Sequence, residues 1–192
     1  SSAPRELLAR DPDNRELARQ GRWRIEAELV RDSALQLSGL LVPRIGGPSV
    51  RPYQPDGYWE NLNFPPREYV ADQGEAQYRR GLYIWWQRTF LHPSLMAFDA
   101  PSREECVADR NRSNLPQQAL VLLNDPTYVE AAKALAEKIA RLSGISDEAR
   151  IIELYKRALQ RVPTKLESTT LMQVLNKHRA QLSNDNKAST EL

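Results

Sequence analysis

The chain has 192 residues, 41% of them apolar, which is enough for one sizeable core and too few for more than one large or two small domains. Its 27 basic and 25 acidic residues nearly balance, which argues against a dedicated nucleic-acid binder. One cysteine and two histidines exclude a disulfide framework, a Cys-rich zinc site and covalently attached haem, so no metal or cofactor is expected in this chain.

The beginning of the chain indicates a piece of a longer protein. Ser1 is not a methionine, and the residues after it lack the charged and apolar segments of a signal peptide. We therefore expect a targeting signal, and part of any functional site, to lie upstream of Ser1. No apolar run reaches the roughly eighteen residues that a membrane-spanning helix needs, so no transmembrane segment is expected here.

The basic residues are unevenly distributed along the chain. Residues 1–132 hold sixteen Arg and no Lys, whereas residues 133–192 hold five Arg and six Lys. Arg makes planar contacts with carboxylates and carbonyls and tolerates partial burial better than Lys does. We expect dense polar contacts in the first two-thirds of the chain, although a bias in codon usage would also favour Arg.

Apolar residues spaced by three and four predict a helix over residues 22–41. Gly39 weakens its last turn, and Pro43 stops it. The predicted apolar stripe consists of Trp23, Ala27, Val30, Ala34, Leu37 and Leu41.

A proline-rich segment follows this helix. Residues 43–66 contain six prolines and three glycines, which excludes a long helix. The aromatic residues in this segment favour an ordered loop, over about residues 43–70, rather than a linker. Its side chains suit a sugar or an extended peptide, or alternatively fold back over the core. The candidate binding residues are Arg51, Tyr53, Gln54 and Trp59, with Tyr58 beside them.

The middle of the chain gives weaker signals. Residues 72–90 fit either a helix or a strand around Leu82–Trp86. Ser102, three residues before Glu105, predicts a short capped helix that contains Cys106. Pro116 predicts a second short helix through residues 120–123.

The last third of the chain is predicted to be helical. Asp125-Pro126, Ser146 and the pair Thr164 and Glu167 mark three helix starts. The first of these helices carries an apolar stripe, Val129, Ala132, Ala136, Ile139 and Leu142. The predicted fold is mostly α: one irregular multi-helix domain over residues 1–182, with 43–70 as a proline-rich insertion, 126–182 as a helical subregion and 183–192 as a flexible tail.

The polar segment from residue 92 to 125 is the strongest candidate for chemistry. Cys106 is flanked by arginines, and His92 and Asp99 could complete a thiol-based catalytic set. The alternative, which we prefer, is a buried thiol that packs as a small apolar side chain. The same segment offers further binding candidates, namely Arg103, Arg112 and Asn114.

Several multi-residue motifs occur in an order that resembles a known family. They include Arg31-Asp32-Ser33-Ala34-Leu35, Gly46-Gly47-Pro48-Ser49-Val50, Pro52-Tyr53-Gln54-Pro55, Phe98-Asp99-Ala100-Pro101-Ser102-Arg103-Glu104 and the run from Gln118 to Pro126. The chain resembles the C-terminal part of an uncharacterised domain of large planctomycete proteins that also carry a cytochrome-c-like domain. The resemblance implies an exported parent protein, often with haem in an upstream domain, and supplies no catalytic residue.

One departure from the family pattern is visible. Where an Arg-Thr-Asn-Thr-Pro-Leu-Gln run is expected, the chain has Arg112, Ser113, Asn114, Leu115, Pro116, Gln117 and Gln118. The hydroxyl that follows the asparagine is therefore lost.

The sequence favours an accessory or interaction domain of an exported, extracytoplasmic protein. We expect it to bind another domain of the same protein, or an envelope protein, through residues 46–59 and 92–114. Two alternatives remain: binding or processing of a polysaccharide through Tyr53, Tyr58 and Trp59, and a thiol-dependent enzyme that uses Cys106.

Overall fold

The computed structural model describes residues 4–21, 24–59, 68–88 and 90–184. Within these residues the chain forms seven α-helices and two short 3-10 helices, with isolated β-bridges and no sheet, so the predicted mostly helical fold is confirmed. The α-helices are α1 (Arg5–Arg10), α2 (Ala27–Ser38), α3 (Pro93–Ala97), α4 (Pro116–Asn124), α5 (Pro126–Ala140), α6 (Asp147–Leu159) and α7 (Lys165–Asn184). The 3-10 helices are η1 (Gly74–Tyr78) and η2 (Gly81–Tyr83).

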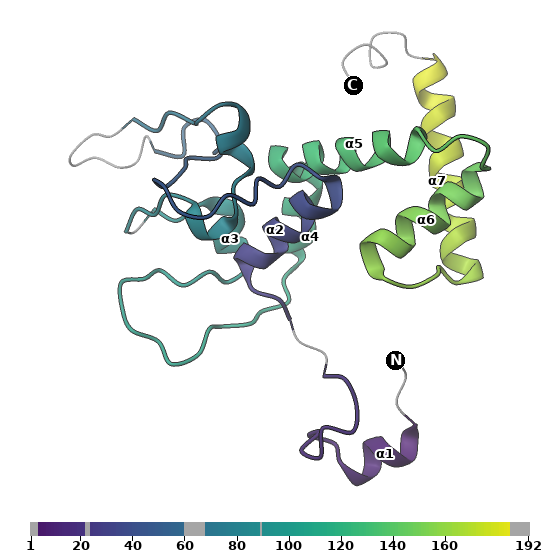
Figure 1. The fold of residues 1–192 in the computed structure, drawn as a ribbon, viewed down its shortest axis with the longest axis horizontal. Coiled ribbons are helices and arrows are strands. Elements are labelled where there is room, and N and C mark those ends of the chain that lie inside the picture. The colour runs from purple at the N-terminus through teal and green to yellow at the C-terminus, as the bar shows by residue number, and fades with distance from the viewer. Residues whose placement is uncertain (1–3, 22–23, 60–67, 89, 185–192) are drawn as a thin grey trace.

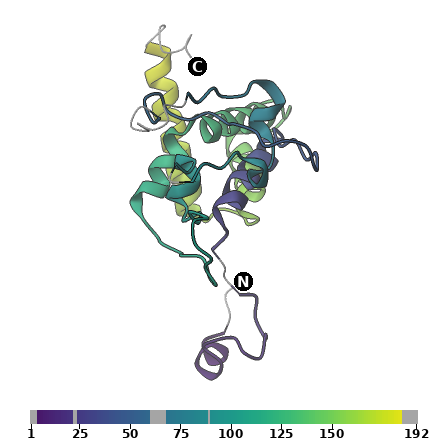
Figure 2. The same cartoon turned by 90° about the vertical axis from the view of Figure 1, so that its left-hand side faces the viewer.

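Helix α2 lies at the centre of the fold. It packs against α5, α3 and η2, and α4 packs against α3 and α5 (Figure 1). Helix α6 packs against α5 and α7 at the other end of the molecule. Helix α1 stands away from the other helices in both views (Figures 1 and 2). The small apolar core consists of Ala27, Ile84 and Leu95, packed against by Trp86, Phe98 and Ala100.

Helix α2 is shorter than predicted, and it buries a different face. It begins at Ala27 and ends at Ser38, and the following Gly39 adopts a left-handed φ of 75°. Trp23 lies outside the described residues. Among the described residues of the predicted stripe only Ala27 is buried, whereas Arg31 and Leu35, outside the stripe, are almost fully enclosed. The buried face is therefore turned relative to the apolar pattern, because Arg31 finds carbonyl partners inside the fold.

Arg79 holds the proline-rich loop in place. Its side chain is fully buried, and its guanidinium donates to the carbonyls of Pro48, Arg44 and Gly46 at 2.9, 3.1 and 2.5 Å. The guanidinium also lies 4.0 Å from the ring centroid of Tyr83. The described part of the loop is thus ordered by an arginine that acts on backbone carbonyls, as the Lys-free composition predicts.

The predictions for the middle of the chain are partly wrong. Within the predicted segment 72–90, the described residues form η1 and η2 rather than a long helix or a strand. The helix predicted after Ser102 is absent, and residues 101–112 form a loop. Arg103 has a φ of 59°, which a right-handed helix cannot contain, and its guanidinium lies 3.9 Å from the ring centroid of Trp86.

The helix starts of the last third are confirmed. The Asp125 carboxylate accepts the Thr127 N–H at 2.9 Å, which caps α5. Ser146 caps α6 by accepting the Ala149 N–H at 3.2 Å. Thr164 and Glu167 form a reciprocal capping box at the start of α7, with distances of 2.7 and 3.3 Å.

The buried face of α5 differs from the predicted stripe, as it does in α2. Tyr128 and Ala131 are buried, whereas Val129, Ala132 and Ala136 are exposed. Of the predicted stripe, Ile139 alone is buried, and Leu142 beyond the helix is half-buried. The tail beyond residue 184 lies outside the described residues.

Candidate interaction surfaces

Two of the binding residues predicted in the proline-rich loop lie inside the fold. Trp59 is only 8% exposed, and its indole N–H donates to the buried Gln54 side chain. The rings of Tyr69 and Phe90 stack on Trp59 at centroid distances of 5.5 and 5.1 Å. In this arrangement Trp59 contributes to an internal aromatic cluster rather than to an open platform for a sugar ring.

The other two loop candidates are accessible. Arg51 is exposed, and its guanidinium lies 4.8 Å from the ring centroid of Trp85. Tyr53 is exposed, although its backbone N–H donates to the Gln77 side chain at 3.0 Å. Of the four predicted loop residues, Arg51 and Tyr53 are therefore the two that a ligand or a partner could contact.

His92 is buried and fully hydrogen-bonded. The Tyr53 carbonyl can only accept, so His92 Nε2 donates to it at 2.9 Å, and Nδ1 accepts from the Ser94 hydroxyl at 2.9 Å. Burial, and then the positive charge of Arg31, lower the pKa of His92 from 6.5 to about 4. The imidazole is therefore neutral and enclosed, with both ring nitrogens occupied.

The three candidate catalytic residues are not connected by any described contact. Asp99 accepts the Ser113 backbone N–H at 2.6 Å and the Ser113 hydroxyl at 2.8 Å. Cys106 is exposed in the loop of residues 101–112. The preferred interpretation of Cys106 as a buried thiol is therefore wrong, because the helix that would have buried it does not form. Among the described residues, no group of three or more His, Cys, Asp or Glu side chains could hold a metal ion.

The loop of residues 101–112, called the projecting loop below, stands away from the helices in Figures 1 and 2. Its base is fixed by the contact of Asp99 with Ser113 and by Arg110, which pairs with Glu28 at 2.7 Å and with Glu26 at 3.1 Å. Arg103 and Arg112 are exposed on this loop. Asn114 lies just beyond it and accepts from Arg24 at 3.2 Å. The loop therefore presents two of the predicted binding arginines to solvent.

Helix α4 buries a polar side chain and exposes apolar ones, the reverse of an ordinary amphipathic helix. The residue that it buries is polar: Gln118 is 4% exposed, donates to Ser113 and accepts from Arg24. Its outward side chains are apolar, with Leu123 71% and Leu120 58% exposed. Leu120 and Leu123, three residues apart on the face opposite Gln118, form what we call the α4 leucine surface; Leu115 and Leu122 are exposed as well.

Leu115 occupies the position at which the expected motif has a hydroxyl. It is the N-cap residue of α4, with φ −108° and ψ 144°, and no side chain caps the helix. A threonine here could accept a backbone N–H of the first turn. In this chain the N-cap position of α4 instead carries an exposed apolar side chain.

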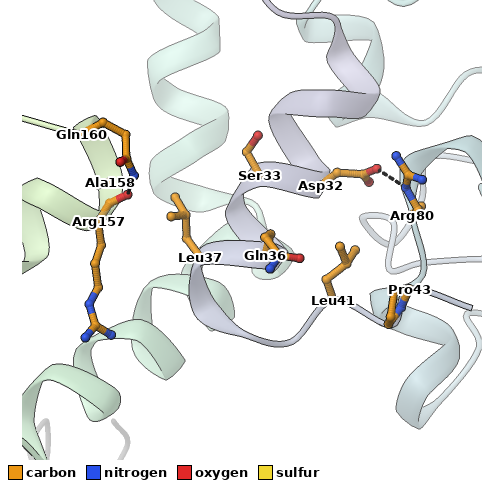
Figure 3. Close-up of a pocket in the computed structure, with 10 residues that line it drawn as sticks. All are labelled: Asp32, Ser33, Gln36, Leu37, Leu41, Pro43, Arg80, Arg157, Ala158 and Gln160. Atoms are coloured by element: carbon orange, nitrogen blue, oxygen red, sulfur yellow. Dashed lines mark hydrogen bonds and ion pairs between the residues drawn. The ribbon is translucent and has the colours of Figure 1, made fainter.

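A groove of about 550 Å³ lies between α2 and the carboxyl end of α6 (Figure 3). At one end Arg80 Nε donates to Asp32 at 3.1 Å, and the backbone N–H of Gly81 donates to Asp32 at 2.6 Å. The lining residues are Asp32, Ser33, Gln36, Leu37, Leu41, Pro43, Arg80, Arg157, Ala158 and Gln160. Sequence reasoning missed this groove, and the one available signal was the presence of Leu37 and Leu41 in the predicted stripe of α2.

The structure thus defines a mostly helical domain that presents apolar and arginine-bearing surfaces. Within the described residues, no helix combines the length and apolarity required to cross a bilayer. The PSD1 family, a protein of unknown function (DUF1553), matches residues 1–175, and the chain belongs to this family. The family is found at the C-terminal end of planctomycete cytochrome-c proteins, which confirms the resemblance seen in the sequence. No curated protein and no solved structure matches the chain.

Proposed function

We propose that this chain is an interaction domain that docks onto another part of the cytochrome-c protein that carries it. The observation that supports this proposal is the inverted helix α4, which encloses Gln118 and exposes Leu120 and Leu123. A helix gains stability when its apolar face is removed from water, at about 25 cal/mol per Å². Because Leu120 and Leu123 of α4 are exposed to water, a partner that covered them would gain this free energy on binding.

The surroundings of α4 also suit an interface. Val129, near the start of the next helix, α5, is also 48% exposed. Arg103 and Arg112 on the projecting loop precede α4 in the chain. Protein interfaces commonly combine an apolar centre with a polar rim, and arginine is enriched in them. Contiguous exposed apolar surface marks an interaction site in many soluble proteins.

The family supplies the partner in this proposal. Because the family occurs at the C-terminal end of cytochrome-c proteins, the nearest available partner is the upstream part of the same polypeptide. On this proposal haem is held by that upstream part and not by this chain. The domain would act outside the cytoplasm, since the resemblance implies an exported parent protein.

The test is a calorimetric titration of this chain with the upstream, cytochrome-c-containing part of the parent protein. The double variant Leu120→Glu, Leu123→Glu places two carboxylates on the α4 leucine surface. It should weaken binding by about 30-fold or more, because loss of a central apolar anchor costs about 2 kcal/mol or more.

Leu166→Glu is the matched control. Leu166 is 77% exposed on α7, so its substitution changes charge and apolarity without touching α4. Binding should be unchanged in this variant. Absence of binding by the unmodified chain, or equal binding by the α4 double variant, would overturn the proposal.

A further inference from the structure

The groove between α2 and α6 carries a second inference, which is independent of the α4 leucine surface. Its floor is apolar and comes from segments far apart in the sequence: Leu37, Leu41 and Pro43 on one side and Ala158 on the other. Figure 3 shows Leu37 between α2 and the end of α6, with Leu41 and Pro43 continuing toward Arg80. A volume of about 550 Å³ lies within the range of sites for small molecules and short peptide segments.

Two arginines contribute the charge of the groove. Arg157 Nε donates to Glu153 at 2.7 Å, and Arg80 Nε donates to Asp32 at 3.1 Å. Each guanidinium is thus oriented through Nε, and its Nη atoms make no hydrogen bond to any described residue. Both side chains remain partly exposed, at 45% for Arg80 and 39% for Arg157. The Nη pair of a guanidinium is suited to grip a carboxylate through two parallel hydrogen bonds.

The acidic residue of the lining is already occupied. One oxygen of Asp32 accepts the Gly81 N–H at 2.6 Å, and the other accepts from Arg80. The backbone of Gly81 is pressed against α2, since a Cβ at this position would lie 2.9 Å from the Cα of Glu28. This close approach fixes Arg80 at the edge of the groove. The groove consequently presents hydrogen-bond donors to a ligand. Both oxygens of its carboxylate, Asp32, already accept hydrogen bonds from the protein, which disfavours binding of a cation there.

We propose that the groove binds an acidic peptide segment in which apolar side chains lie between two carboxylates. The apolar side chains would pack on Leu37 and Leu41, and the carboxylates would bind the Nη groups of Arg80 and Arg157. A basic segment lacks the groups that these two guanidinium ions recognise.

Fluorescence anisotropy provides the test. The probe is a fluorescein-labelled hexapeptide, Gly-Glu-Leu-Leu-Glu-Gly, and its comparison peptide has lysine in place of both glutamates. The acidic peptide should bind saturably and more weakly as salt is raised, and the lysine peptide should not bind. Arg157→Gln should weaken binding of the acidic peptide about tenfold. Leu41→Glu should abolish binding, because it places a carboxylate in the floor of the groove.

Arg141→Gln is the matched control. Arg141 pairs with Glu137 four residues earlier at 3.4 Å, as Arg157 pairs with Glu153, but it lies outside the groove. Circular dichroism should show that both glutamine variants are folded. Absence of saturable binding, equal binding of the lysine peptide, or equal effects of Arg157→Gln and Arg141→Gln would overturn the inference. The α4 double variant should still bind the acidic peptide, which separates this test from that of the proposed function.

Discussion

Replacement of His92 by glutamine should remove a loss of stability that the protein undergoes between pH 6.5 and pH 4. His92 is 2% exposed, donates to the Tyr53 carbonyl and accepts from the Ser94 hydroxyl, so the fold accommodates its neutral form. Burial and the nearby Arg31 charge lower the pKa of His92 from 6.5 to about 4. Between these two values the unfolded chain binds a proton that the folded chain does not, so the free energy of unfolding falls as the pH falls.

The magnitude follows from the difference between the two pKa values. At about 1.4 kcal/mol per pH unit, the drop from 6.5 to about 4 corresponds to about 3 kcal/mol of stability. The loss begins near pH 6.5 and is complete near pH 4, below which this histidine adds nothing further. Urea unfolding followed by circular dichroism at pH 7.5, 6, 5 and 4.2 measures it.

The comparison between the unmodified chain and His92→Gln isolates the contribution of His92 to the pH dependence of the free energy of unfolding. Burial raises the pKa of Asp125, which stabilises the folded state as the pH falls, but this contribution is present in both proteins. His178→Gln is the control, because His178 is exposed on α7, and this variant should follow the unmodified chain. Parallel stability curves for the unmodified chain and His92→Gln between pH 6.5 and pH 4 would refute the argument.

Three further predictions concern single positions. Leu115→Thr restores a hydroxyl at the uncapped N-terminus of α4 and should stabilise the fold by about 1 kcal/mol in urea unfolding; no gain would mean that the hydroxyl does not reach a backbone N–H. Gly81→Ala should destabilise it by about 1–3 kcal/mol, because the new Cβ would meet the Glu28 backbone at 2.9 Å; a neutral result would show that the turn can shift. Arg79→Lys leaves loop carbonyls without their donors and should cost about 2–3 kcal/mol. The Trp85 amide donates to the carbonyl of Val50 in the loop at 2.7 Å, so its hydrogen exchange should be faster in Arg79→Lys. Unchanged exchange would contradict the assignment of the destabilisation to the loop.

The features that the sequence predicts well depend on residues close together in the chain. Asp125 and Ser146 each accept an N–H from a residue two or three positions later. Thr164 and Glu167 satisfy each other across three residues. Such caps need no tertiary partner, so their spacing alone locates the starts of α5, α6 and α7.

The features that the sequence misses depend on residues far apart. Arg31 is buried in α2 because it donates to the carbonyls of Gln77 and Arg79, more than forty positions away. The helix predicted after Ser102 is replaced by a loop in which Arg103 stacks on Trp86. The groove combines α2, Arg80 and the end of α6, which no local pattern places together.

Apolar side chains from three parts of the chain lie at the surface of the structure, and for α2 and α4 this outcome has a physical cause. Leu37 and Leu41 line the groove, Val129 is exposed on α5, and the α4 leucine surface faces solvent. In α2 and α4 the interior positions are taken by Arg31 and Gln118, which bond to carbonyls and to polar side chains. A buried polar side chain that donates to carbonyls or bonds to polar side chains, as Arg31 and Gln118 do, is tolerated, whereas exposed leucines gain free energy only when something covers them. Burial of Arg31 and Gln118 therefore leaves apolar side chains of α2 and α4 on the surface, where the two proposed contacts, a neighbouring domain on α4 and an acidic peptide on α2, would cover them.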